Sequence, residues 1–361
     1  MVTRFARPEL EAPITRVARR VDEAIEGLRP YGRSALWGEA ITAMLGLNRA
    51  TTHLLRAQLV LLGSLAGGGP AEGAGAERFA VGVELLHLFM LVHDDVMDNA
   101  ALRRGRPTLR VALTAVDPSL GWQEARDLPI VLGNLLHVLA MRHLMPSPGG
   151  SAGEAVASGL VLDASCRAGA GQFQDLLGFR GLGGDKEAFR RELVDKTAFH
   201  AFAAPFTAGL RLARPDGDAE PAIAWGCHVG LAFQGADDLA DLVGSPAVTG
   251  KDGLRDLLQG RTSLPLFFLR ERAAGKDCHF LDAIAGKHAM ELGERVWLDD
   301  LLRACRVVEA CAGWVRAEIA AAAGVRAASG FTAAAQEGMA AIEQGLLVYL
   351  DAVAASALGD D

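Results

Sequence analysis

Residues 79–98 read FAVGVELLHLFMLVHDDVMD, an apolar, helix-like run that ends in the DDxxD motif Asp94–Asp98. A second DDxxD motif, Asp237–Asp241, ends another apolar run far along the chain. Residues four apart share one face of a helix, so the first and last aspartates of each motif lie together. Carboxylates clustered beside apolar surface need a neutralising cation, and Mg²⁺ suits them because it usually also holds substrate phosphates. The two motifs therefore predict a metal–diphosphate site shared between two helices.

Helical periodicity runs through most of the chain, and clusters of glycine and proline separate the segments. No alternating pattern predicts a sheet, and no linker divides the chain. The sequence therefore predicts an all-α fold, a single large helical bundle around a central apolar cavity, over residues 1–361. Residues 1–50 are assigned only as an N-terminal extension or first helices. The predicted helices cover 9–28, 34–46, 51–66, 75–98, 124–144, 153–177, 186–212, 218–243, 263–273, 298–322 and 332–355.

Composition excludes several classes of protein. Half of the 361 residues are hydrophobic, and the net charge of −8 argues against a general nucleic-acid binder. The five cysteines are scattered without CxxC spacing, which favours free thiols in a reducing cytoplasm. The N-terminus leads into a charged segment, unlike a signal peptide. The most apolar stretch, Phe79–Val92, is too short to cross a bilayer, so we expect a buried helix and no transmembrane segment.

Three arginines, Arg103, Arg104 and Arg106, follow the first motif closely. Gly105 and Pro107 indicate that the helix has ended before them. Arginine binds phosphate oxygens bidentately and stays charged at any working pH. One short segment therefore offers metal ligands followed by cations for a diphosphate.

Residues that precede the first motif on the same predicted helix have two interpretations. His87 lies two turns before Asp94, where it would either contact a substrate phosphate or be an ordinary core histidine. Phe89 and Met90 lie about one turn before Asp94. They would be core residues, or the floor that limits the length of an apolar substrate tail.

Cations also surround the second motif in the sequence. Gln234 precedes Asp237, and Lys251 and Arg261 follow in a predicted loop region. Lys196 and Thr197 interrupt an otherwise apolar helical run, where a lysine usually reaches towards solvent.

In order and spacing, these segments resemble the trans-isoprenyl diphosphate synthases, also called polyprenyl synthetases. The resemblance extends over roughly residues 45–270. The matching residues are Glu84–His87, Val92–Asn99, Arg103–Thr108, Gly171-Gln172, Lys196-Thr197, Phe233-Gln234, Asp237–Asp241, Gly250-Lys251 and Gly260–Pro265.

The resemblance implies an isoprenoid synthase fold in a cytoplasmic homodimer. It implies a prenyltransferase that joins an allylic diphosphate (dimethylallyl, geranyl or farnesyl) to isopentenyl diphosphate, with three Mg²⁺ ions in the active site. The Mg²⁺ ligands implied are Asp94, Asp98, Asp237 and Asp241, supported by Asp95 and Asp238. The allylic-diphosphate contacts implied are Arg103, Lys196, Gln234 and Lys251, with Thr197 and Arg261 also in the substrate site. The isopentenyl-diphosphate contacts implied are Arg56, His87 and Arg104.

One stretch departs from the family pattern. The family usually carries GGKxxRP, whereas residues 51–57 here read TTHLLRA. His53 takes the place of a lysine that holds isopentenyl diphosphate, and neutral imidazole binds diphosphate less strongly than an ammonium group. Arg261 replaces a usual lysine, which keeps the charge but changes its geometry.

The first motif has two residues between its aspartate pair and its last aspartate, and Phe89 lies five positions before it. In the family this form is typical of short products, so we expect geranylgeranyl diphosphate (C20) or farnesyl diphosphate (C15). Two alternatives are a terpene cyclase, which also ionises allylic diphosphates, and a non-catalytic subunit of a prenyl diphosphate synthase.

Overall fold

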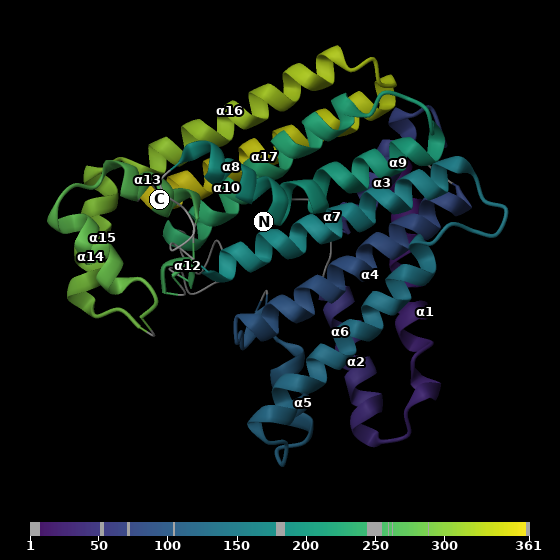
Figure 1. Ribbon diagram of the computed structural model, residues 1–361, viewed down its shortest axis with the longest axis horizontal. Helices are drawn as coiled ribbons and strands as arrows, with labels where there is room; N and C mark the ends of the chain where they lie inside the picture. The colour runs from purple at the N-terminus through teal and green to yellow at the C-terminus, as the bar shows by residue number, and fades with distance from the viewer. Residues whose placement is uncertain are drawn as a thin grey trace. The chain divides into compact units, whose positions relative to one another are not determined.

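The structure is a computed structural model that describes residues 8–50, 54–70, 73–103, 105–177, 185–243, 255–258, 260–261, 263–287 and 289–358. These residues are almost entirely helical, which confirms the all-α prediction (Figure 1). The chain folds into two compact units. The N-terminal unit comprises Ala6–Val161 and Pro205–Gly217, and the C-terminal unit comprises Leu162–Ala204 and Asp218–Asp361.

The N-terminal unit is built around one long helix, α4. This helix packs against α1, α3 and α6 (Figure 1). Every residue from Phe79 to Leu88 is buried, as is Val92, while residues 89–91 are half-buried. The stretch Phe79–Val92 is therefore a buried helix, as predicted. The elements of this unit are α1 (Pro8–Glu26), η1 (Arg29–Tyr31), α2 (Ala35–Ala50), α3 (Leu55–Ala66), α4 (Ala74–Met97), β1 (Leu102–Arg103), β2 (Arg106–Pro107), α5 (Leu109–Val116), α6 (Trp122–Leu144), the first part of α7 (Ala152–Leu177) and α9 (Ala204–Ala213).

Two glycines allow α3 and α9 to touch through their backbones. A Cβ atom on Gly63 would lie 1.9 Å from the carbonyl oxygen of Phe206, and one on Gly209 would lie 1.9 Å from that of Val60. Carbon and oxygen atoms cannot approach so closely, so only glycine fits at either position. This contact fixes α9 to a unit whose other residues lie much earlier in the chain.

The C-terminal unit is built around α10. This helix packs against η3, α13, α16 and α17. Trp225 of α10 is fully buried and its indole nitrogen donates to Glu343 of α17 at 2.9 Å, while Arg326 of α16 pairs with the same carboxylate. The elements of this unit are the rest of α7, α8 (Lys186–Leu193), η3 (Val194–Ala203), α10 (Glu220–Val243), α12 (Arg255–Leu258), α13 (Leu264–Arg272), α14 (Lys276–Ile284), α15 (Leu292–Ala304), α16 (Val307–Ala328) and α17 (Ala333–Leu358).

Among the described residues, α17 is the one helix long and apolar enough to cross a membrane, over Ala333–Ala357. A core helix of a globular unit passes the same test, and α17 packs along α10 and α16. Its buried Glu343 joins both neighbours through the bonds to Trp225 and Arg326. These contacts favour a core helix.

The long helices lie close to their predicted bounds, but several short elements differ. The predicted helix 298–322 is two helices, α15 and α16, because Arg306 between them adopts a left-handed backbone with φ of 49°. The predicted helix 186–212 contains a π-helical segment, η3, between α8 and α9. Helices α5 and α14 and the hairpin β1–β2 were not expected, since each is too short to show a clear period.

All five cysteines, which lie in the described part of the chain, are free. The absence of disulfides agrees with the scattered spacing of these residues in the sequence.

Candidate active site

The first aspartate motif spans the end of α4. Asp94 and Asp95 lie in the last turn, and the amide of Asp98, the C-cap residue, donates to the carbonyl of Asp94 at 2.8 Å. This bond shows that Asp98 follows Asp94 by one helical turn, as the i, i+4 spacing predicts. Asn99 then takes a left-handed conformation with φ of 49°, which ends the helix.

A short β-hairpin with two residues in each strand follows and returns the chain towards α4. Strand β1 pairs antiparallel with β2, with Arg103 opposite Arg106, and Gly105 supplies the positive φ of 74° that the tight turn requires. The buried hydroxyl of Thr108 donates to the carbonyl of Ala100 at 2.8 Å and closes the base of the hairpin.

Arg103 binds both adjacent aspartates of the motif. Its Nε donates to Asp95 and its terminal nitrogen to Asp94, each at 2.7 Å. Burial acts to lower the pKa of the Arg103 guanidinium, but the two carboxylates outweigh that effect and raise it. The side chain of Asp95 is 8% exposed and that of Asp94 is 31% exposed. Asp95 is therefore placed to orient Arg103, whereas Asp94 keeps an open side for another ligand.

The ring of Phe89 contacts two histidines, one on α4 and one on α6. Its centroid is 4.6 Å from that of His93 and 4.9 Å from that of His137. His93 contacts α6 closely, since a Cβ atom on Gly133 would lie 2.4 Å from its ring. Burial lowers the pKa of His93, so this ring is neutral near pH 7. Met90 is half-buried beside Phe89, and both pack against the core of the unit.

The predicted contacts for isopentenyl diphosphate lie on α3 and α4. Arg56 is in the first turn of α3, and His87 of α4 is buried with 6% of its surface exposed. The buried carboxylate of Glu84 accepts from the amide of Ala57 at 2.8 Å and so caps the N-terminus of α3. His53 and Arg104, also predicted here, lie outside the described residues.

The second aspartate motif lies inside α10, and its three carboxylates differ in exposure. Asp238 and Asp241 are buried, at 5% and 6% exposed, while Asp237 is half-buried. Burial raises the pKa of Asp238 to about 7, opposed by hydrogen bonds from the amide of Leu264 and from the side chain of Gln234. These bonds, at 2.9 and 2.5 Å, tie Asp238 to α13 and make it an anchor for the motif.

Lys196 and Arg261 share one buried carboxylate that the sequence did not predict. Asp175 of α7 is 1% exposed, and one of its oxygens lies 2.8 Å from Lys196 Nζ and 3.1 Å from Arg261. Gly171 lets the π-helical segment lie directly on α7, since a Cβ there would be 2.6 Å from the Lys196 backbone. The sequence offered one indication of this role: Asp175 lies about one helical turn after Gln172, which belongs to a segment that resembles the family. Lys251, predicted as a third cation, lies outside the described residues, and Thr197 is half-buried on η3.

The donors at the first motif fit Mg²⁺ as it binds in phosphate-transfer sites. Within the described ranges, no three histidine, cysteine or acidic side chains gather into a ready-made metal cage. Mg²⁺ is commonly held by one or two carboxylates together with water and substrate phosphates. Asp94 and Asp98, one turn apart at the end of α4, match that arrangement.

A family model described as polyprenyl synthetase matches residues 40–296. The chain belongs to the polyprenyl synthetase family. It is 30% identical over 264 residues to the short chain isoprenyl diphosphate synthase of Methanothermobacter thermautotrophicus, covering 69% of this chain and 77% of that protein. It is 35% identical over 219 residues to a geranylgeranyl diphosphate synthase of Mycobacterium tuberculosis, covering 58% of this chain and 56% of that protein.

The fold agrees with that of solved polyprenyl synthetases. The geranylgeranyl pyrophosphate synthase from Corynebacterium glutamicum, complexed with isoprenyl diphosphate and magnesium, superposes with a TM-score of 0.83. The identity is 19%, and the match covers 94% of this chain and 99% of that one. Relatives at 30% identity are named as farnesyl and geranylfarnesyl diphosphate synthases. This polyprenyl synthetase is accordingly a prenyltransferase of isoprenoid biosynthesis, and the family match leaves its product length open.

Proposed function

We propose that this polyprenyl synthetase is a Mg²⁺-dependent enzyme that joins an allylic diphosphate to isopentenyl diphosphate and releases an all-trans C20 diphosphate. The observation that carries the proposal is Arg103, which lies on Asp94 and Asp95 at the end of α4. A diphosphate that brings Mg²⁺ to the carboxylates would meet a guanidinium already in place.

In the proposed reaction, the bond between C1 of the allylic substrate and its diphosphate oxygen breaks, and the alkene of isopentenyl diphosphate attacks C1. The released diphosphate then takes a proton from the carbon beside the new cation, which forms the double bond of the lengthened chain. Mg²⁺, when bound, supplies charge that stabilises the departing diphosphate. Arg103, Lys196 and Arg261 add fixed positive charge for the same purpose.

Asp175 is proposed to hold two of these cations ready. Because Lys196 and Arg261 both contact the same oxygen of the buried Asp175 carboxylate, we propose that their orientations are set before substrate binds. A pre-arranged cation needs no reorganisation as charge develops on the leaving group. Asp175 is thus a positioning residue in this proposal.

Product length is proposed to depend on the ring of Phe89. It contacts the rings of His93 and His137 and lies about one turn before Asp94. A chain that grows from the carboxylate end along α4 would meet this ring. Relatives named for C15, C20 and C25 products match the chain about equally well, so the comparisons do not favour one length. The preference for C20 over C15 rests on the sequence pattern before the first motif.

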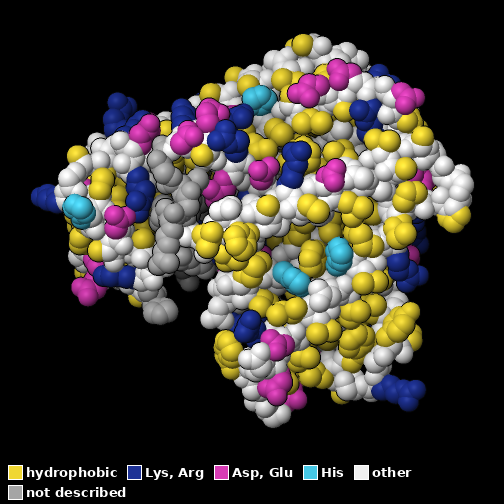
Figure 2. All heavy atoms as spheres, in the orientation of Figure 1, with side chains coloured by type: hydrophobic (Ala, Val, Ile, Leu, Met, Phe, Trp, Pro, Cys, Tyr) yellow, Lys and Arg dark blue, Asp and Glu magenta, His cyan; other side chains and the backbone are white. Residues whose placement is uncertain are grey.

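The enzyme is proposed to act as a cytoplasmic homodimer. Helix α6 exposes Val131 and Val138, which lie two turns apart on about the same face. Hydrophobic side chains show over this helix on the face drawn in Figure 2. Exposed apolar residues in rows mark surfaces that bind a partner. Light scattering of the purified chain should report twice the monomer mass, and Val138→Asp should lower it.

The function is tested by incubating the protein with Mg²⁺, isopentenyl diphosphate and each of three primers, dimethylallyl, geranyl and farnesyl diphosphate. We expect a C20 alcohol by mass spectrometry after dephosphorylation. Asp94→Asn should abolish this product, while Asp163→Asn, on an exposed position of α7, should not. Hydrocarbons formed without isopentenyl diphosphate would instead identify a terpene cyclase.

A second candidate function is that of one component of a two-subunit synthase. It is favoured by one relative, 29% identical over 231 residues, which is named heptaprenyl diphosphate synthase component 2. In that case the chain alone would give no product with any primer, and activity would require a second polypeptide.

A further inference from the structure

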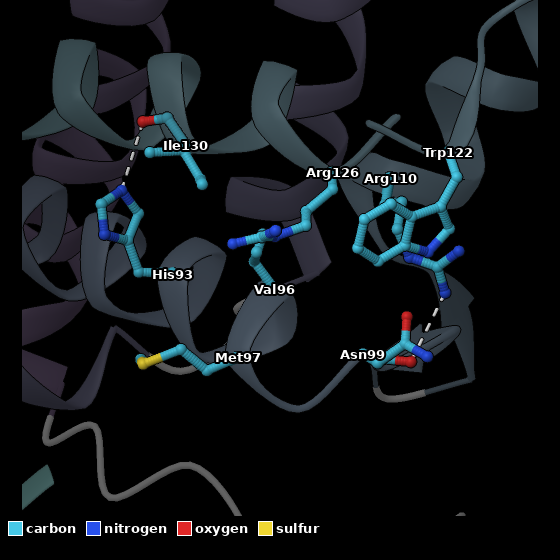
Figure 3. A pocket seen from close by; sticks show the side chains of 8 residues that line it. All are labelled: His93, Val96, Met97, Asn99, Arg110, Trp122, Arg126 and Ile130. Atoms are coloured by element: carbon cyan, nitrogen blue, oxygen red, sulfur yellow. Dashed lines mark hydrogen bonds between the residues drawn. The ribbon is translucent and has the colours of Figure 1, made fainter. Parts of the chain in front are cut away.

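A cavity of about 490 Å³ lies in the N-terminal unit beside the end of α4 (Figure 3). Its walls come from α4, from the residue that follows the first aspartate motif, from α5 and from α6. The lining residues are His93, Val96, Met97, Asn99, Arg110, Trp122, Arg126 and Ile130. The volume is within the range of small-molecule sites, roughly 300–1,000 Å³. None of the motif's aspartates lines it.

The charge of the cavity is positive. The described residues that line it include two arginines and no acidic residue. Among the described residues, neither Arg110 nor Arg126 forms an ion pair. The buried Nε of Arg110 has no hydrogen-bond partner there, and its terminal nitrogen makes only long bonds of 3.4 Å. Buried polar groups are normally satisfied, so this guanidinium retains capacity for an acceptor.

The second arginine lies over an aromatic ring. The guanidinium carbon of Arg126 is 5.5 Å from the centroid of Trp122. In the view of Figure 3 the guanidinium groups of Arg110 and Arg126 are drawn on opposite sides of the Trp122 ring. Guanidinium groups bind phosphate oxygens bidentately, so an anion with several oxygens fits this end.

The rest of the cavity is apolar and open to solvent. Trp122 is 67% exposed and Met97 is 44% exposed, and Val96 and Ile130 continue the same surface. Large side chains exposed together commonly mark a binding surface. An anionic ligand with an apolar tail would use both ends of the cavity.

We propose that this cavity is a second ligand site, which binds the diphosphate group of a prenyl diphosphate between Arg110 and Arg126 with its tail along Trp122. The argument for binding depends only on the residues that line the cavity. The expected effect on catalysis rests on the proposed function, because the cavity adjoins the segment that carries Arg103.

The connection runs through the backbone after the first motif. Arg110 bonds to the carbonyls of Asn99 and Ala100, which join Asp98 to the hairpin of Arg103. A diphosphate that draws the Arg110 guanidinium into the cavity removes those bonds. Occupancy therefore loosens the hairpin and weakens the grip of Arg103 on Asp94, which makes the ligand an inhibitor.

The experiment measures tryptophan fluorescence in EDTA, so that no metal assists binding at the aspartates. One titration uses inorganic diphosphate and another uses geranylgeranyl diphosphate. We expect saturable quenching by both, with the prenyl compound binding more tightly. Trp122→Phe should remove the response.

Variants of the two arginines separate this site from other anion binding. Arg126→Gln and Arg110→Gln should each weaken binding at least ~10-fold, as expected for the loss of one charge-assisted hydrogen bond. Arg142→Gln, an exposed position on the same α6, should bind as the parent does. Because Arg126 is exposed, its variant tests the site even if Arg110→Gln fails to fold.

Equal quenching in Arg126→Gln and Arg142→Gln would overturn the site, as would tighter binding of inorganic diphosphate than of the prenyl compound. If the parent protein shows normal synthase activity but no saturable quenching by either ligand in EDTA, this inference is refuted and the proposed function stays intact. Normal binding by a protein with no synthase activity would refute the proposed function and leave the site.

Discussion

Replacing Asp175 by asparagine should both destabilise the C-terminal unit and weaken substrate binding. The Asp175 side chain is 1% exposed, and its carboxylate forms ion pairs with Lys196 at 2.8 Å and with Arg261 at 3.1 Å. Removing one partner of a buried ion pair costs about 3–5 kcal/mol, because a buried charge is left uncompensated. Arg261 is 10% exposed, but Lys196 is 24% exposed and regains some water. We therefore expect the lower end, about 3 kcal/mol.

Asparagine keeps the shape of aspartate, so the change adds no cavity to the charge effect. The free energy of unfolding is obtained from urea titrations followed by circular dichroism, and KM for the allylic diphosphate from steady-state kinetics. Asp163→Asn, an exposed acid on the same helix α7, is the matched control and should leave both quantities unchanged. Loss of less than ~1 kcal/mol in Asp175→Asn, with an unchanged KM, would refute the ion-pair argument, since exposed pairs are worth no more than that.

Four further substitutions each test a single position. Gly63→Ala should lower the free energy of unfolding by about 3 kcal/mol or more, because its Cβ meets the Phe206 carbonyl at 1.9 Å. Gly159→Ala, with no atom within 4 Å, should gain up to ~1 kcal/mol in the same urea assay. Phe89→Ala should lengthen the product measured by mass spectrometry, and an unchanged product would exclude this ring as the floor. At Glu318 burial acts to raise the pKa, but bonds from His228 and Arg190 lower it below 4.5, so its stabilisation is present above that pH and is lost on acidification. The stability difference between the parent and Glu318→Gln should shrink as the pH falls below 4.5, and a constant difference would contradict this assignment.

The sequence predicted the long helices because their apolar residues recur with the period of a helix facing a core. The predicted helix 75–98 differs from α4, Ala74–Met97, by one residue at each end. The break between α15 and α16 was not predicted, because it occurs at Arg306, which has a positive φ, and not at a glycine or proline. The π-helical segment η3, Val194–Ala203, was also not predicted, since it continues the apolar run of a predicted helix and contains no glycine or proline.

Local spacing likewise predicted part of the site. Arg103 lies close to Asp94 in the sequence, so one helix end and one hairpin suffice to join them. Asp175 was missed because its partners come from a different helix and from a loop. Tertiary packing brings the Asp175 carboxylate to two cations that are distant in sequence, and the pattern of a single segment cannot predict such a contact.

The close packing of α3 on α9, at Gly63 and Gly209, bears on how the chain is synthesised and how it can be divided. The N-terminal unit is interrupted in sequence, since its last segment, Pro205–Gly217, follows Leu162–Ala204, which belongs to the other unit. During translation, the face of α3 that carries Gly63 must therefore wait for α9 to leave the ribosome. A fragment cut at Val161 would expose this face permanently. Efforts to express half of the molecule should accordingly retain α9 or supply it as a separate peptide.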